Sequence, residues 1–199
     1  MKQTIIVIGR EFGSGGHEIG EIIAKELGLN FYDRNMLDEI ADEKEINNHE
    51  FNKFDEKPIV KLFSRHVRGH SSSMEEHLAL MQFEFIANKV KEGESFVVVG
   101  RCADHVVKDE KGVITIFVYG DKLVKARRVM RKYNLDEVQA ENKMARHDKL
   151  RKFYHNYYSD TKWGHPSTYD LCINSSKLGV EKTAEFLLEY IKERTENEE

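Results

Sequence analysis

A cluster of glycines follows the first apolar run of the chain, in the stretch IIVIGREFGSGGHEIGEIIAKELG at residues 5–28. Gly9, Gly13, Gly15 and Gly16 stand between this apolar run and an amphipathic stretch with helical spacing. The backbone N–H groups of such a loop, together with the N-terminus of the following helix, favour binding of an anion and above all of a phosphate. The loop therefore predicts chemistry on a phosphorylated compound.

The loop departs from the Walker pattern GxxxxGK[ST] at its most important position. With Gly15 as the second glycine of the pattern, Gly16 takes the position of the lysine and His17 that of the hydroxyl residue. The lysine that normally spans the β- and γ-phosphates is therefore absent. We hypothesise that Arg10 supplies this positive charge from the opposite wall of the loop, because it stands at the mouth of the first strand.

Two further features of the loop stay open. The dinucleotide fingerprint GxGxxG also fails, because Glu18 stands where its last glycine belongs, although Asp33 lies where its ribose-binding acid would be. If the chain binds Mg²⁺, Ser14 or Glu18 can replace the missing Walker hydroxyl, or Asp33 can hold the ion through water. The sequence does not rank these candidates.

Two basic stretches, KLVKARRVMRKY at 122–133 and ARHDKLRKFYHNYY at 145–158, are the other candidates for binding phosphate. A charge run usually marks a solvated helix face. These runs, however, follow a buried strand, and ligands of parallel α/β sheets bind at the carboxyl edge of the strands. Arg101 directly follows another buried strand, so we expect it at the same edge.

Short apolar strands alternate with helical patterns along the chain. Each strand is an unbroken apolar run, which predicts a parallel sheet covered by helices on both faces and a single α/β domain. We expect strands at 4–8, 30–33, 96–99, 113–119 and 171–173, and helices at 19–27, 34–45, 73–90, 122–133, 135–158 and 180–191. Residues 47–72 are polar and irregular, and we expect a mobile insert there.

The composition is that of an ordinary globular protein, with 199 residues, 40% hydrophobic and 33% charged residues. The formal net charge of −4 gives no general attraction to nucleic acid or to anionic membranes. We find neither an apolar run long enough to span a membrane nor a signal-peptide pattern. Cys102 and Cys172 lack CxxC spacing, so we interpret them as reduced thiols of a cytoplasmic protein.

The pieces IGREFGSGGHEIGEIIAKELG, FYDR, VVVGRCADHVV, KARRVMRKY, DKLRKFYHNYY and YDLCINSSKLGVE, taken in this order, resemble the nucleoside monophosphate kinases, and most closely the cytidylate-kinase-like family. The resemblance implies a P-loop kinase with a three-layer α/β/α core, a monophosphate-binding insert at about 34–94 and a lid at about 133–165. It also implies ATP and Mg²⁺ as cofactors and a nucleoside monophosphate as acceptor, CMP or dCMP first. It leaves open whether the protein is a homodimer.

The resemblance also assigns roles to individual residues. Arg128 or Arg131, with Arg146 and Arg151, would gather around the donor and the transferring group, and Arg10 joins them by the hypothesis given above. The donor phosphates would lie against Gly13, Ser14, Gly15, Gly16, His17 and Glu18. The acceptor would contact Asp33, Arg34, Arg65, Arg68, Arg101, Asp104 and Asp148. The stretch GRCAD differs from the Gly-Arg-Asp of cytidylate kinases by two residues that intervene before Asp104. No side chain is assigned as a direct metal ligand.

An acceptor phosphate is largely dianionic at neutral pH, because its second pKa is about 6. It needs no catalytic base, so alignment and charge neutralisation by arginines and Mg²⁺ suffice. Two alternatives stay open. One is a kinase of the same fold for another small phosphorylated acceptor. The other is a nucleotide-binding module without turnover, which the absent Walker lysine allows.

Overall fold

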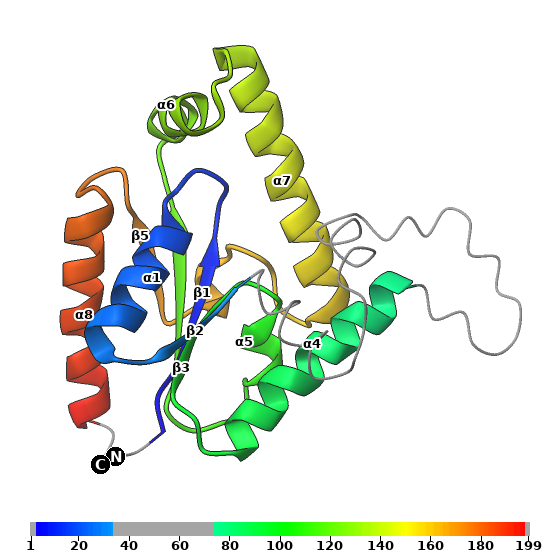
Figure 1. The fold of residues 1–199 in the computed structure, drawn as a ribbon, viewed down its shortest axis with the longest axis vertical. Coiled ribbons are helices and arrows are strands. Elements are labelled where there is room, and N and C mark those ends of the chain that lie inside the picture. The colour runs from blue at the N-terminus through cyan, green and yellow to red at the C-terminus, as the bar shows by residue number, and fades with distance from the viewer. Residues whose placement is uncertain (1–2, 34–73, 198–199) are drawn as a thin grey trace, which may run out of the picture.

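The computed structural model describes residues 3–33 and 74–197. Within these ranges five parallel strands form one sheet in the order β2-β3-β1-β4-β5 (Figure 1). The strands are β1 (Ile5–Arg10), β2 (Asn30–Tyr32), β3 (Phe96–Val99), β4 (Val113–Tyr119) and β5 (Leu171–Asn174). The predicted parallel sheet is thus confirmed.

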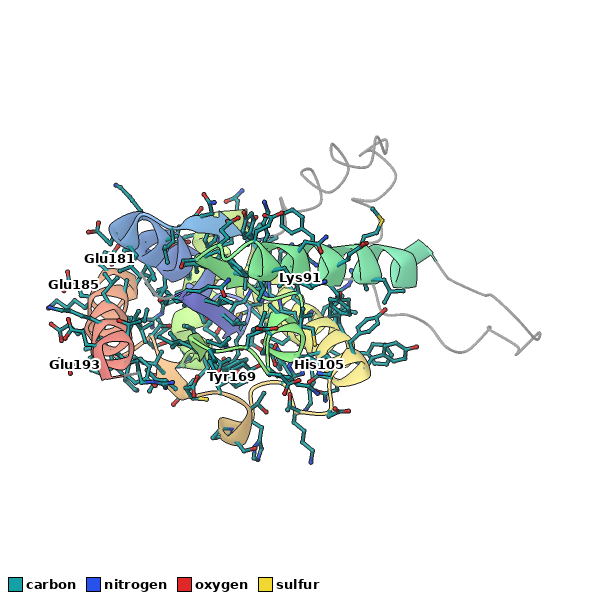
Figure 2. The ribbon with its side chains drawn as sticks, turned by 90° about the horizontal axis from the view of Figure 1, so that it is seen from below. Lys91, His105, Tyr169, Glu181, Glu185 and Glu193 are labelled. Atoms are coloured by element: carbon teal, nitrogen blue, oxygen red, sulfur yellow. The ribbon has the colours of Figure 1, made fainter. Side chains whose placement is uncertain are left out.

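Helices cover both faces of this sheet. α1 (Gly16–Leu27) and α8 (Val180–Asn197) pack on one face, and α4 (Met74–Lys91) and α5 (Ala103–Val106) pack on the other. In the view from below, α8 and α4 lie on opposite sides of β1, and Glu181, Glu185 and Glu193 of α8 face outward (Figure 2). α6 (Lys122–Tyr133), α7 (Glu137–Tyr158) and the short 3₁₀ helix η1 (Pro166–Thr168) complete the described fold.

Strand β1 shows why the strands are unbroken apolar runs. Successive side chains of a strand point to opposite faces. Ile6 and Ile8 are fully buried in the cluster under α1 and α8, whereas Ile5 and Val7 are buried in the cluster under α4 and α5. Because neither face of the sheet meets water, no position of β1 before its end selects a polar residue.

β1 is longer than the sequence predicts. The expected strand ended at Ile8, but Gly9 and Arg10 continue the ladder opposite Phe117 and Val118 of β4. The prediction was wrong here because two glycine-loop residues were taken for a turn, although their backbone keeps its pairing. Arg10 is therefore the last residue of a strand at the carboxyl edge of the sheet.

The expected insert at 34–94 is described only in its second part. Ala79, Phe85 and Ile86 of α4 are buried against the sheet, so this helix belongs to the packed core. The expected helix at 34–45 and the expected mobile segment at 47–72 lie outside the described residues. Among the described helices, none combines the length and the apolar character that crossing a membrane requires.

Candidate active site

The loop between β1 and α1 is a tight turn whose backbone accepts hydrogen bonds from buried serine hydroxyls. Gly13 and Gly15 have φ angles of 82° and 83°, a region that glycine adopts without steric cost. Ser14 is buried, and its hydroxyl donates to the carbonyl oxygen of Glu11 at 2.9 Å. Ser175, which follows β5, donates from its Oγ to the Ser14 carbonyl oxygen at 2.6 Å. These bonds fix the loop before any ligand binds.

A cavity of about 510 Å³ opens over this loop. Its size is within the range of small-molecule sites. Basic side chains from the end of β1, α6 and α7 face acidic side chains from the loop and β2. The lining residues are Arg10, Glu11, Phe12, Gly13, Gly15, Gly16, His17, Glu18, Asp33, Arg128, Val129, Lys132, Tyr133, Lys143, His147 and Arg151. The arrangement suits a polyphosphate, so we call this cavity the donor cleft.

Arg10 occupies the space that a side chain at position 16 would need. A Cβ atom added to Gly16 would lie 2.6 Å from the Cβ of Arg10 and 3.3 Å from its Cγ. Contacts under 3.0 Å between such atoms are essentially absent from real proteins. Because the closest contact is with the Cβ of residue 10, any side chain at position 10 excludes a lysine at the Walker position, which gives a physical reason for Gly16.

The guanidinium of Arg10 extends across the carboxyl edge of the sheet to the loop after β3. A Cβ atom on Gly100 would lie only 1.8 Å from Arg10 Nη1, so this position must be glycine while Arg10 keeps its place. Arg10 lines the donor cleft and also a second, smaller cavity of about 40 Å³. Its charge thus stands at the boundary between the two cavities.

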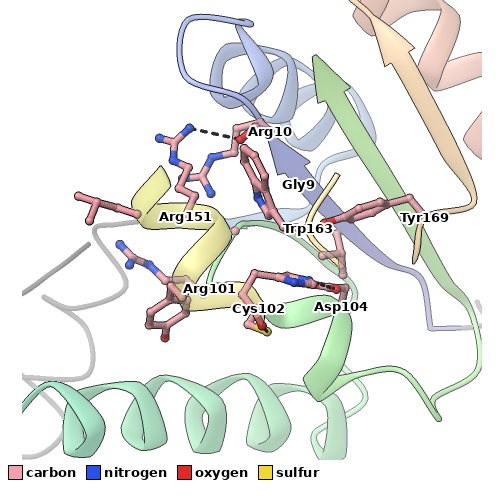
Figure 3. Close-up of a pocket in the computed structure, with 13 residues that line it drawn as sticks. Gly9, Arg10, Arg101, Cys102, Asp104, Arg151, Trp163 and Tyr169 are labelled. Carbon is pink, nitrogen blue, oxygen red and sulfur yellow. Dashed lines mark hydrogen bonds and ion pairs between the residues drawn. The ribbon is translucent and has the colours of Figure 1, made fainter. Parts of the chain in front are cut away.

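The smaller cavity lies between β1, the loop after β3 and the second half of α7 (Figure 3). Its lining residues are Val7, Gly9, Arg10, Gly100, Arg101, Cys102, Asp104, Leu150, Arg151, Tyr154, His155, Trp163 and Tyr169. Three arginines face it from three elements, while aromatic rings and the Asp104 carboxyl line the rest. Because it joins an anion-binding region to a polar and aromatic region, we call it the acceptor cavity.

Arg151 and Arg101 complete this group of arginines. Arg151 donates from Nη1 to the carbonyl oxygen of Arg10 at 3.3 Å, the contact drawn as a dashed line in Figure 3. Its guanidinium carbon lies 5.5 Å from the centre of the Phe12 ring, a cation–π distance. Arg101 is buried and has a φ of 61°, which is uncommon for a residue with a side chain.

Asp148 has a different place from the one expected. The resemblance puts it at the acceptor, but its Oδ1 accepts the backbone N–H of Phe12 at 2.6 Å, and it does not line the acceptor cavity. Lys125 is buried beside it, with Nζ 2.6 Å from Glu11 Oε2 and 3.9 Å from Asp148 Oδ2. Burial raises the pKa of the Asp148 carboxyl, against the lowering effects of the Phe12 N–H and of Lys125. These groups join α6 and α7 to the loop.

His17 and Asp33 form a close pair on the floor of the donor cleft. His17 Nε2 lies 2.5 Å from Asp33 Oδ2, and Nδ1 lies 3.4 Å from Glu21 Oε2. Mg²⁺ prefers oxygen ligands and usually takes one or two carboxylates beside substrate phosphates and water. Ser14 is turned into the loop, whereas Glu18 and Asp33 both line the cleft and are paired with Arg128 and His17, respectively, so either carboxylate would have to exchange its partner to hold a Mg²⁺ ion.

The remaining expected arginines fall into three groups. Arg128 lines the donor cleft and is paired with Glu18. Arg131 and Arg146 are exposed and line neither cavity, so the structure does not bring them to the others. A third group lies outside the described residues and consists of Arg34, Arg65 and Arg68.

Asp104 lines the acceptor cavity but is paired within the protein. Its Oδ2 lies 2.7 Å from His155 Nε2, and both side chains are nearly inaccessible to water. The sequence gives no signal for this pair, because His155 stands in a helix 51 positions away from Asp104. Lys125 was also missed as a site residue, because a lysine in a basic stretch is usually exposed to solvent. This lysine is instead buried and pairs with Glu11.

Phe12, His147 and Lys143 are further cleft residues that the sequence did not single out. The rings of Phe12 and His147 stack with their centres 4.3 Å apart. Lys143 Nζ lies 6.0 Å from the centre of the Phe12 ring. The periodicity of α7 could have placed Lys143, His147 and Arg151 on one face, since they are spaced at four residues.

Comparisons with known proteins point in the same direction as this geometry. The model of the cytidylate kinase-like family matches residues 5–177. A crystal structure described as an uncharacterized protein from Eubacterium ventriosum is 37% identical, with a TM-score of 0.76, over 96% of this chain and 99% of that chain. No curated protein matches the sequence.

Two other solved structures share the fold at low identity. A shikimate kinase from Acinetobacter baumannii in complex with shikimate is 15% identical, with a TM-score of 0.54, over 96% of this chain and 94% of that chain. A gluconokinase from Sinorhizobium meliloti is 14% identical, with a TM-score of 0.57, over 98% of this chain and 95% of that chain. At this identity the likeness shows the P-loop kinase fold alone.

Proposed function

The chain belongs to the cytidylate kinase-like family, and we propose that it transfers the γ-phosphoryl group of ATP to a nucleoside monophosphate, with CMP or dCMP as the preferred acceptor. Family and fold together support a small-molecule kinase. The observation that carries the finer proposal is that Arg10 and Arg151 line both the donor cleft and the acceptor cavity. Two fixed positive charges at this boundary suit a phosphoryl group that passes between two phosphorylated partners.

The residues of the site divide the reaction between them. The loop N–H groups, Arg128 and Arg10 would hold the donor phosphates, and Arg101 would hold the phosphate of the acceptor. Arg10 and Arg151 would neutralise charge on the transferring group, which is the main requirement of phosphoryl transfer. A bound Mg²⁺, held by Asp33 or Glu18 together with the donor phosphates, would add further charge neutralisation. Since the acceptor phosphate is already a nucleophile, no side chain need act as a base.

The far end of the acceptor cavity bears on the choice of acceptor. Trp163 and Tyr169 offer aromatic surface, and the Asp104 carboxyl, paired with His155, offers a hydrogen-bond acceptor beside it. A pyrimidine base with an amino group matches both features and favours cytosine over uracil, although the cavity of about 40 Å³ must widen to admit it. Arg34, Arg65 and Arg68 are proposed as further ligands of the acceptor phosphate on the family resemblance alone.

The test is release of ADP by the purified protein with Mg-ATP and one acceptor at a time. The panel is CMP, dCMP, UMP, AMP, GMP, shikimate, gluconate and no acceptor; shikimate and gluconate represent the hydroxyl acceptors of kinases with this fold. We expect turnover of about 1 to 100 per second with CMP or dCMP, the range usual for kinases. ATP binding without ADP release for any acceptor would contradict the proposal and favour a binding module.

A further inference from the structure

We propose that Cys102, Asp104 and His155 form a binding site for a transition-metal ion of the zinc class in the wall of the acceptor cavity. One ligand atom of each residue lies within 4.8 Å of the other two, and this is the only such group of three among the residues that the structure describes. Thiolate, imidazole and carboxylate are the three ligand types that zinc takes in proteins. The inference does not depend on the proposed kinase function.

The three side chains come from two separate elements that face one another. Cys102 and Asp104 lie at the start of α5, after β3, and His155 lies in the second half of α7 (Figure 3). Cys102 and His155 are 3% and 4% exposed, so water competes little for their ligand atoms. An ion at this point would therefore connect the loop after β3 to α7.

The distances need only a modest adjustment. Tetrahedral bonds of the usual lengths put neighbouring ligand atoms roughly 3.3 to 3.6 Å apart. His155 Nε2 and Asp104 Oδ2 are 2.7 Å apart, and Cys102 Sγ lies on a third side, with a weak 3.8 Å contact to the His155 carbonyl oxygen. An ion would displace both the proton between the imidazole and the carboxylate and the thiol proton of Cys102, which pass to water, and the sulfur would approach by about an ångström.

The surroundings support a metal ligand set more than a simple ion pair. A metal-bound imidazole usually donates its other N–H to an oxygen, and His155 Nδ1 lies 3.4 Å from Asn156 Oδ1. The cavity of about 40 Å³ leaves room for a water molecule as the fourth ligand.

Cobalt(II) gives a direct test, because a thiolate bound to Co²⁺ produces a charge-transfer absorption band. The untagged full chain is stripped with a chelator and titrated with Co²⁺ alone, and then with Zn²⁺. We expect one Co²⁺ per chain, a thiolate band, and loss of that band when Zn²⁺ displaces the cobalt. Cys172→Ser is the matched control, since it removes the other cysteine and should leave the band unchanged.

Cys102→Ser should abolish the band. Circular dichroism of the metal-free variant checks that it folds, and if it does not, His155→Gln serves in its place because it keeps the thiol. His155→Gln should weaken Co²⁺ binding by at least about tenfold, since even supporting residues of metal sites are worth that much. The proposal is overturned by a wild-type protein without the band, by a band that survives in Cys102→Ser or vanishes in Cys172→Ser, or by unchanged affinity in His155→Gln.

Discussion

The guanidinium of Arg10 lies against Gly100, so closely that a Cβ atom there would be 1.8 Å from Arg10 Nη1. Gly100→Ala should therefore displace the Arg10 charge from the boundary between the two cavities. Because a misplacement of about 1 Å can cost a hundredfold in rate, we expect kcat to fall by at least about tenfold. Steady-state ADP release with the preferred acceptor measures this change in kcat.

Gly93→Ala is the matched control for Gly100→Ala. Gly93 also has a positive φ, of 74°, but a Cβ there meets no atom within 4 Å. Both variants should lose about 1 kcal/mol of stability from the strained backbone, and only Gly100→Ala should lose activity. Equal kcat values for the two variants would show that the contact with Arg10 does not matter.

Lys125 should be a main source of stability in the contact of α6 and α7 with the glycine loop. Lys125→Met removes a buried ammonium that faces Glu11 Oε2 at 2.6 Å and leaves two partly buried carboxylates without it. We expect a loss of about 2 to 3 kcal/mol in the free energy of unfolding, below the value for a fully buried pair because both acids are partly exposed. Urea denaturation measures this loss.

Lys122→Met provides the comparison on the same helix. Lys122 pairs with Glu141 at 2.7 Å, but its side chain is 67% exposed. An exposed pair of this kind is worth about 0 to 1 kcal/mol. Losses of the same size at both lysines would mean that the burial of Lys125 has no energetic consequence.

Asp148 should give the folded protein a distinctive pH dependence. Burial raises the pKa of its carboxyl above the value in the unfolded chain, so the folded state binds this proton more tightly. The stability from this group is therefore present at low pH and is lost as the pH rises through the folded pKa. The stability advantage of the wild type over Asp148→Asn should be larger near pH 4 than near pH 7.

Asp121→Asn should show the opposite trend. Hydrogen bonds from Lys177 and Asn174 lower the pKa of Asp121, so its contribution is present at neutral pH and fades as the pH falls through the folded pKa. Urea denaturation of both variants at several pH values measures the two trends. Parallel slopes for the two variants would contradict the assignment for Asp148.

The sequence predicted most of the sheet because its strands are buried on both faces. Unbroken apolar runs as short as Phe96–Val99 are typical of strands that are covered on both faces. The end of β1 was missed because Gly9 and Arg10 look like loop residues, and only their pairing with β4 shows otherwise. The composition of the strands therefore predicted the buried core well and the ends of the strands less well.

The sequence predicted the type of site better than it predicted which residues line it. The glycine loop indicated a phosphate site, and Arg10, Arg101 and Arg151 were selected and are brought together at the two cavities. Arg131 and Arg146 were selected from the same basic stretches but are exposed, because charge in a sequence does not show which side of a helix faces the cleft. That information comes from packing between α6 and α7, which is long-range.

The central claim is that Arg10 carries the charge that a Walker lysine carries elsewhere. Arg10→Ala should lower kcat by about a hundredfold to a thousandfold, the usual cost of removing one electrostatic donor from a transition state. Arg194→Ala, which changes an arginine of α8 paired with Asp170, is the control and should leave kcat unchanged.

The most direct measurement is kcat of the double variant Arg10→Gly/Gly16→Lys beside Arg10→Gly and Gly16→Lys. The single Gly16→Lys variant brings a side chain into the 2.6 Å contact with Arg10, so we expect it to lose activity. Only glycine at position 10 removes the Cβ atom that the lysine would meet, so the double variant should recover at least about tenfold in kcat over Arg10→Gly. A double variant no faster than Arg10→Gly, or full activity in Arg10→Gly, would contradict the claim.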